Sequence, residues 1–101
     1  MSMHNPPHAG EIIAGIMEDL DIGIRELARA LAIAPSTASR MVSGTTAITP
    51  EMAIKLAAVL GSTPEMWLRI QAIYDLERAQ KTVDLSALNT SYNPGSLQKT
   101  N

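Results

Sequence analysis

Residues 25–44, RELARALAIAPSTASRMVSG, contain the pattern that decides the fold of this chain. Apolar residues recur at helical spacing in its first part. Pro35 then suits the first position of a second helix, because its missing N–H costs nothing there. Gly44 supplies the left-handed conformation in which such a helix commonly ends. The stretch therefore predicts two short helices, 24–31 and 35–43, joined by a tight connection, which is the arrangement of a helix-turn-helix.

Three further helices are expected on either side of this pair. The first, from Ala9 to Leu20, carries an apolar stripe that includes its last residue. The tetrapeptide Thr-Pro-Glu-Met begins at Thr49 and again at Thr63. It combines a threonine cap, a proline at the first helical position and a carboxylate in the first turn. It predicts helices from 50 to about 60 and from 64 to about 80, so the expected fold class is all-α with five helices.

The same signals define the domain organisation. We expect one domain at 8–82, with the helix-turn-helix core at 24–44. The remainder, 83–101, is expected to be a C-terminal extension whose scattered apolar residues pack lightly: Val83, Leu85 and Leu88. Its last part, 89–101, is polar and contains Pro-Gly, so we expect it to be disordered.

Composition restricts the classes of function. Hydrophobic residues make up 46% of the chain, which is a globular share. Cysteine is absent, which excludes disulfides, cysteine-ligated metals and thiol catalysis. No apolar run approaches the roughly 18 residues of a membrane helix, and no signal-peptide pattern opens the chain. We expect a cytoplasmic protein with no membrane association and no cofactor.

The net charge of −2 hides an uneven distribution along the chain. Positions 11–21 contain four carboxylates and no basic residue, whereas positions 24–44 contain three arginines and one glutamate. An acidic first helix beside a locally basic pair of helices is compatible with one DNA-facing surface.

The second helix of the pair divides into an inner and an outer face. Ala38 and Met41 are expected to point into the core. The outer residues are polar or small: Pro35, Ser36, Thr37, Ser39 and Arg40. Arg40 is the only long cation on this helix, and arginine makes the commonest specific base contact, to guanine O6 and N7.

The chain resembles the helix-turn-helix of phage repressors (Cro/C1, or XRE) and, more narrowly, the HigA-type antitoxins. The narrower resemblance rests on three stretches: HAGEII at 8–13, ITPEMA at 48–53, and MWLRIQAIYDL at 66–76. It covers about residues 8–78. It implies a lambda-repressor-like domain that forms a homodimer and binds a palindromic operator in its own promoter. It also implies a HigB-like toxin partner, an mRNA interferase of the RelE type.

Matched position by position, the resemblance implies roles for the outer residues. Pro35, Ser36 and Arg40 would contact bases. Phosphate contacts would come from Ala34, Thr37, Ser43, Thr45 and Thr46, with Ser39 on the same surface. The chain differs from the family pattern at two places, and both differences are expected to weaken phosphate binding. Gly23 and Ile24 stand where the family has a hydroxyl cap and a polar residue, and Ala34 stands where it has Ser or Thr.

Several features of the sequence have alternative interpretations. His4, His8 and Glu11 invite a metal site, but the prolines between the two histidines keep them off a common helix face. Arg25 and Arg29 are expected to be solvated, and Trp67 is expected in the core, on an apolar face with Met66, Ile70, Ile73 and Tyr74. No catalytic triad, phosphate loop or zinc motif occurs, so an enzyme is not expected. A solitary phage-type repressor without a toxin is the alternative function.

Overall fold

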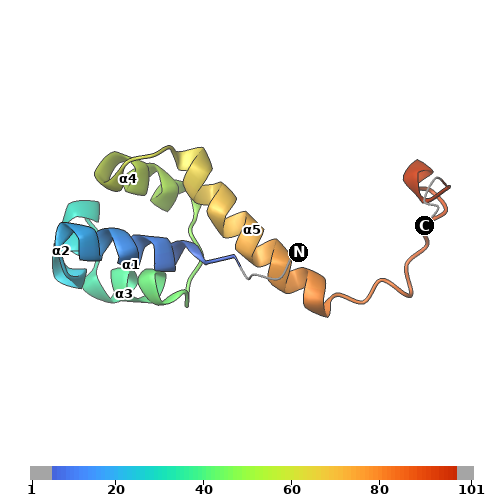
Figure 1. Ribbon diagram of the computed structural model, residues 1–101, viewed down its shortest axis with the longest axis horizontal. Coiled ribbons are helices and arrows are strands. Elements are labelled where there is room, and N and C mark those ends of the chain that lie inside the picture. Colours follow the sequence, from blue (N-terminus) through green and yellow to red (C-terminus); the bar gives the residue numbers. More distant parts are fainter. Residues whose placement is uncertain (1–5, 98–101) are drawn as a thin grey trace.

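The computed structural model describes residues 6–97 and contains five α-helices and one short 3-10 helix (Figure 1). The elements are α1 (Ala9–Leu20), α2 (Ile24–Leu31), α3 (Pro35–Ser43), α4 (Pro50–Leu60), α5 (Pro64–Thr82) and η1 (Pro94–Leu97). No strand occurs in this range. The all-α, five-helix prediction is confirmed, and η1 was not predicted. No helix in the described part of the chain is long and apolar enough to cross a membrane.

The core is aliphatic and takes side chains from all five α-helices. Its buried members are Ala9, Ile13, Met17, Leu27, Ala28, Leu31, Ala38, Met41, Ile48, Ala53, Leu56 and Trp67. Among residues 6–95 no polar or charged side chain is buried. The fold therefore depends on hydrophobic burial, with helix pairs α1–α3, α2–α3 and α4–α5 in contact.

One expected core position is wrong. Leu20 was assigned to the buried stripe of α1, but it is 55% exposed. The chain reverses immediately after it, at Asp21, which adopts a left-handed conformation and ends α1. Ile22, just beyond the turn, packs against the core instead. Helical periodicity alone does not reveal where a turn takes the last residue away from the core.

The predicted helix caps are present. The Thr49 hydroxyl accepts a hydrogen bond from the Met52 N–H at 3.2 Å, and the Thr63 hydroxyl accepts one from the Met66 N–H at 3.1 Å. Gly44 ends α3 in the left-handed region, with φ 84°. These local signals set where the helices begin and end before any long-range contact forms.

Helix α5 extends well beyond the body of the domain (Figure 1). Its first part is anchored by Trp67, which is 2% exposed and donates a hydrogen bond from Nε1 to the Gly61 carbonyl at 3.0 Å. The predicted burial of its whole apolar face is wrong, because Met66 and Ile73 are exposed. No helix in the described part of the chain covers the outer half of α5. The segment 83–95 is exposed throughout, and 98–101, the end of the predicted disordered tail, lie outside the described residues.

Gly10 lets α1 approach α3 at backbone distance. A Cβ atom built on Gly10 would lie closer than 3.0 Å to the carbonyl oxygens of Met41 and Val42. Backbone carbonyls near the end of a packed helix have little freedom to move away. The glycine is therefore required for the contact between the first helix and the end of α3.

We expect Gly10→Ala to lower the free energy of unfolding by about 1–3 kcal/mol, the usual cost of overpacking a core. Gly15→Ala is the matched control, because it lies on the exposed side of the same helix and its Cβ would meet nothing within 4 Å. That control is expected to stabilise by about 0.5–1 kcal/mol. Urea unfolding of the two variants measures both changes, and equal stability of the two would contradict the role of Gly10.

Candidate nucleic-acid interface

The turn between α2 and α3 is held by the backbone. Ala32 adopts a left-handed conformation with φ 59°, and the Ile33 N–H donates to the Ala28 carbonyl at 3.0 Å. Ala28 and Ala38, one on each helix, are both essentially fully buried. Their small side chains allow α2 and α3 to pack closely, as a helix-turn-helix requires.

The inner face of α3 is buried as the sequence predicted, but its outer face differs at one residue. Ala38 and Met41 are buried, whereas Pro35, Ser36, Ser39 and Arg40 are exposed. Thr37, which was assigned to the outside, is half-buried. It lines a hollow between α3 and the start of α4 together with Met41, Thr46, Ala47, Thr49 and Met52. The open face of α3 is therefore narrower than the sequence indicated.

The N-terminus of α3 differs from those of α4 and α5. Ala34 occupies its N-cap position and offers no side-chain acceptor. The N–H groups of the first turn therefore lack the capping side chain that Thr49 and Thr63 provide for the other two helices. Unsatisfied N–H groups and the positive end of the helix dipole favour an anion at such a terminus.

The loop after α3 is tied to the carbonyl of Arg40. The N–H groups of Thr45 and Thr46 donate to this oxygen, at 2.9 and 3.4 Å. The Ser43 hydroxyl donates to it as well and lies 2.8 Å from the Thr45 hydroxyl. Three of the residues predicted to contact phosphate therefore lie together on the exposed end of α3 and the loop after it: Ser43, Thr45 and Thr46.

Cations on this surface lack ion pairs. The guanidinium groups of Arg25, Arg29 and Arg40 make no salt bridge within residues 6–97. Glu26, the one carboxylate nearby in sequence, is occupied: its Oε1 accepts a hydrogen bond from the Gly23 N–H at 2.9 Å. That bond lowers the pKa of Glu26, so the group stays charged at the N-terminus of α2.

Two residues position the interface in ways the sequence analysis missed. Gln71 on α5 accepts a hydrogen bond from the Ile48 N–H at 3.3 Å and donates to Asp75 at 3.0 Å, which ties the α3–α4 connection to α5. The ring of His8 packs over Gly44, within 4 Å of where a Cβ atom built on this glycine would lie, and forms a T-shaped pair with the ring of Tyr74. Both lie in stretches quoted for the family resemblance, but their roles depend on contacts distant in sequence.

The alternative interpretation of His4, His8 and Glu11 as a metal site finds no support in the described residues. His8 Nε2 lies 3.5 Å from a Glu11 carboxylate oxygen, but no group of three potential ligands is found within residues 6–97. His4 lies outside the described residues.

Comparisons with known proteins identify relatives along most of the chain. A helix-turn-helix family model matches residues 16–68. The HTH-type transcriptional regulator YddM of Escherichia coli K12 is 53% identical over 88 residues, 87% of this chain and 94% of that protein. Antitoxin HigA-1 of Vibrio cholerae is 40% identical over 72 residues, 70% of this chain and 68% of that protein. These two relatives are named as a transcriptional regulator and an antitoxin, in agreement with the prediction that the chain is not an enzyme.

A solved structure shares the architecture. Antitoxin HigA of Pseudomonas aeruginosa, determined with the higBA promoter, is similar with a TM-score of 0.71 and 28% identity, and the match covers 83% of this chain and 99% of that one. This agrees with the resemblance to HigA-type antitoxins that the sequence analysis stated.

Proposed function

Because the chain belongs to the helix-turn-helix family, we propose that it is a DNA-binding antitoxin that represses its own operon and neutralises a HigB-like mRNA interferase. The observation that carries the DNA-binding part is the outer face of α3. It presents small polar side chains and one unpaired arginine on a helix whose inner face is fully packed. A rigid helix with such a face is suited to the major groove.

Within this proposal the residues of the surface have distinct roles. Pro35, Ser36 and Arg40 contact base edges, with Arg40 reading a guanine. Ser39 lies on the same exposed face. The phosphate contacts come from the first turn of α3, at Ala34 and Thr37, and from Ser43, Thr45 and Thr46 after it. Half-burial of Thr37 leaves its backbone N–H as the better phosphate donor.

We expect Arg40→Ala to weaken binding to the operator by about 1–3 kcal/mol and to flatten the preference at one base pair of each half-site. The reason is the loss of the only long side chain that can reach a base edge from α3. Fluorescence anisotropy on duplexes from the promoter upstream of its own gene, with each base pair varied, measures both effects. Arg69→Gln, on the exposed side of α5, is the control for loss of one positive charge. Equal loss on random DNA would make Arg40 a phosphate contact.

The proposal includes a homodimer, since one recognition helix contacts too few bases for specificity and such proteins pair two half-sites. Exposed apolar side chains on the outer half of α5 support it, because Ile73 and Leu76 are 50% and 58% exposed. Three apolar side chains of the extension are exposed as well: Val83, Leu85 and Leu88. A surface of this kind, free in one copy, is suited to contact with a second.

We expect Ile73→Glu with Leu76→Glu to convert the protein to a monomer, because burying two carboxylates at a symmetric contact is strongly unfavourable. Light scattering at high micromolar concentration measures the mass. Ile54→Glu, an exposed apolar residue of α4 that is 59% exposed, is the matched control and is expected to leave the dimer intact. A wild-type monomer at that concentration would contradict the dimer.

The toxin-binding part is supported by the acidic end of α1. Glu18 and Asp21 border a hollow of about 430 Å³ whose other lining residues are apolar or small: Ala14, Met17, Ile22, Ile24 and Val42. RNA-cleaving toxins of the RelE type are basic, so a lysine or arginine of the toxin would have its stem in the hollow and its charge beside the carboxylates.

We expect Glu18→Lys with Asp21→Asn to weaken the complex with the toxin while leaving DNA binding intact. The toxin is sought as a short basic chain encoded beside this gene, and co-purification followed by calorimetry measures the affinity. Lysine suits the C-terminal end of α1 and asparagine tolerates the left-handed conformation of Asp21, so folding is preserved. Glu65→Gln, in the first turn of α5, is the control. Unchanged affinity would exclude this surface, and absence of any such partner would favour the solitary repressor.

A further inference from the structure

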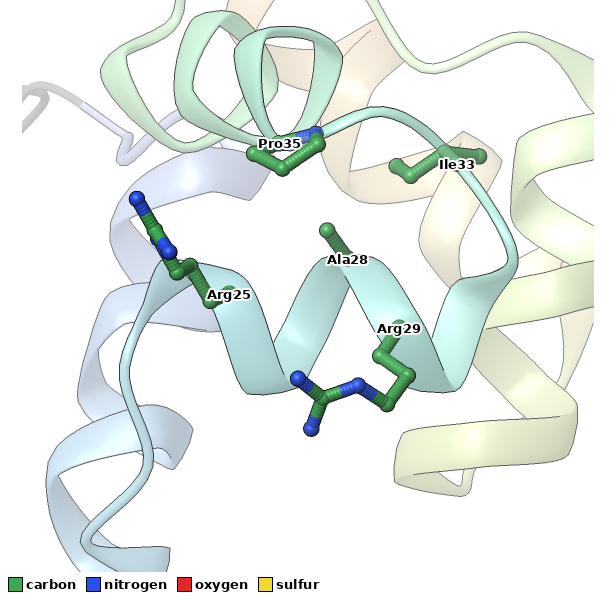
Figure 2. A pocket seen from close by; sticks show the side chains of 5 residues that line it. All are labelled: Arg25, Ala28, Arg29, Ile33 and Pro35. Carbon is green, nitrogen blue, oxygen red and sulfur yellow. The ribbon is translucent and has the colours of Figure 1, made fainter.

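A hollow of about 280 Å³ lies between α2 and the start of α3, and it shares Pro35 with the face proposed for base contacts. Figure 2 shows its lining residues: Arg25, Ala28, Arg29, Ile33 and Pro35. Arg25 and Arg29 come from α2, whereas Ile33 and Pro35 come from the turn and the first residue of α3. Ala28 forms the floor and is 1% exposed, so the hollow exists because this side chain is small.

The two arginines are placed four residues apart on one helix, where side chains share a face. Like charges at this spacing repel each other and destabilise a helix. No carboxylate within residues 6–97 forms a salt bridge with either of them. Glu26 lies between them in sequence and its charge acts on Arg29, but its carboxylate accepts a hydrogen bond from the Gly23 N–H at the start of α2 and forms no salt bridge with either arginine. The pair is therefore suited to an anion from outside the chain.

The start of α3 adds to the same positive field. Pro35 lines the hollow and is the first residue of this helix, whose N-cap residue has no side-chain acceptor. In Figure 2 the guanidinium of Arg25 extends from α2 towards the level of Pro35, while that of Arg29 lies along α2. Two guanidinium groups and the positive end of a helix dipole therefore border one open hollow.

The position of the hollow indicates which anion it meets. Pro35 belongs both to the hollow and to the face proposed for base contacts, so DNA seated on α3 would bring a backbone phosphate towards α2. The first helix of a helix-turn-helix crosses the DNA backbone in complexes of this kind. Ile24 and Ala34, which precede Arg25 and Pro35 in the sequence, offer no polar side chain of their own.

We propose that Arg25 and Arg29, with the first turn of α3, form a binding site for a phosphate diester of the DNA backbone. This proposal rests on the DNA-binding function proposed above and replaces the expectation that both arginines are only solvated. The site carries no base specificity, because it lies beside the groove-reading residues and its donors are charges and backbone N–H groups.

The test measures the salt dependence of DNA binding for Arg25→Gln with Arg29→Gln. Each DNA phosphate that protein cations neutralise releases counterions and contributes about −0.9 to the slope of log K against log salt. We therefore expect the magnitude of this slope to decrease by about 0.9 for each phosphate site lost. Affinity is expected to fall by the same factor on a promoter duplex and on a scrambled duplex of equal length. Arg25→Lys with Arg29→Lys keeps the charges and is expected to retain most of the slope. Arg69→Gln, on the exposed side of α5, controls for the loss of one positive charge elsewhere on the chain.

Three outcomes would overturn the proposal. An unchanged slope in the double glutamine variant, in a protein that still binds the promoter duplex, would remove the phosphate site and leave the proposed function intact. A loss confined to the promoter duplex would make the arginines base contacts. Failure of the wild-type chain to bind either duplex would overturn the DNA-binding function and the phosphate site with it. Circular dichroism confirms that each variant is folded.

Discussion

The close approach of α3 to its neighbours is the constraint on which the rest of the structure depends. On one side, Ala28 and Ala38 leave enough room for α2 and α3 to pack with essentially no exposure of either side chain. On the other side, Gly10 lets α1 contact the carbonyls of Met41 and Val42. Held on both sides by small residues, α3 can present its outer face without moving. Interiors packed at this density resist displacement, which is what a helix that reads DNA needs.

The surface around α3 combines weak local features into one positive region. No side chain caps its N-terminus, the arginines nearby form no salt bridge within residues 6–97, and the one close glutamate accepts a hydrogen bond from the Gly23 N–H. None of these features is strong alone, and the whole chain has a net charge of −2. Their arrangement on one side of the molecule matters more than the sum, because electrostatic attraction to DNA depends on the local field.

The carboxylates proposed for the toxin contact and the exposed apolar residues of α5 lie outside the two helices that form the proposed DNA surface. Glu18 and Asp21 belong to the end of α1 and the turn after it, whereas Ile73 and Leu76 lie on the projecting half of α5 (Figure 1). The proposed DNA, toxin and dimer contacts therefore use different side chains. Such separation allows one small domain to hold several partners, and it lets a substitution affect one contact without the others.

The sequence by itself determined the elements of this protein. Threonine caps, prolines at first helical positions and Gly44 act within a few residues, so they set the helix bounds without tertiary contacts. The inner face of α3 followed equally from periodicity. Tertiary structure decided what depends on distant neighbours: the exposure of Leu20 and Ile73, the half-burial of Thr37 and the link from Gln71 to Ile48. It also placed Arg25 and Arg29 beside Pro35. The burial of a side chain and the electrostatic field around it depend on which helix packs against it, and the spacing of residues in the sequence does not determine that helix.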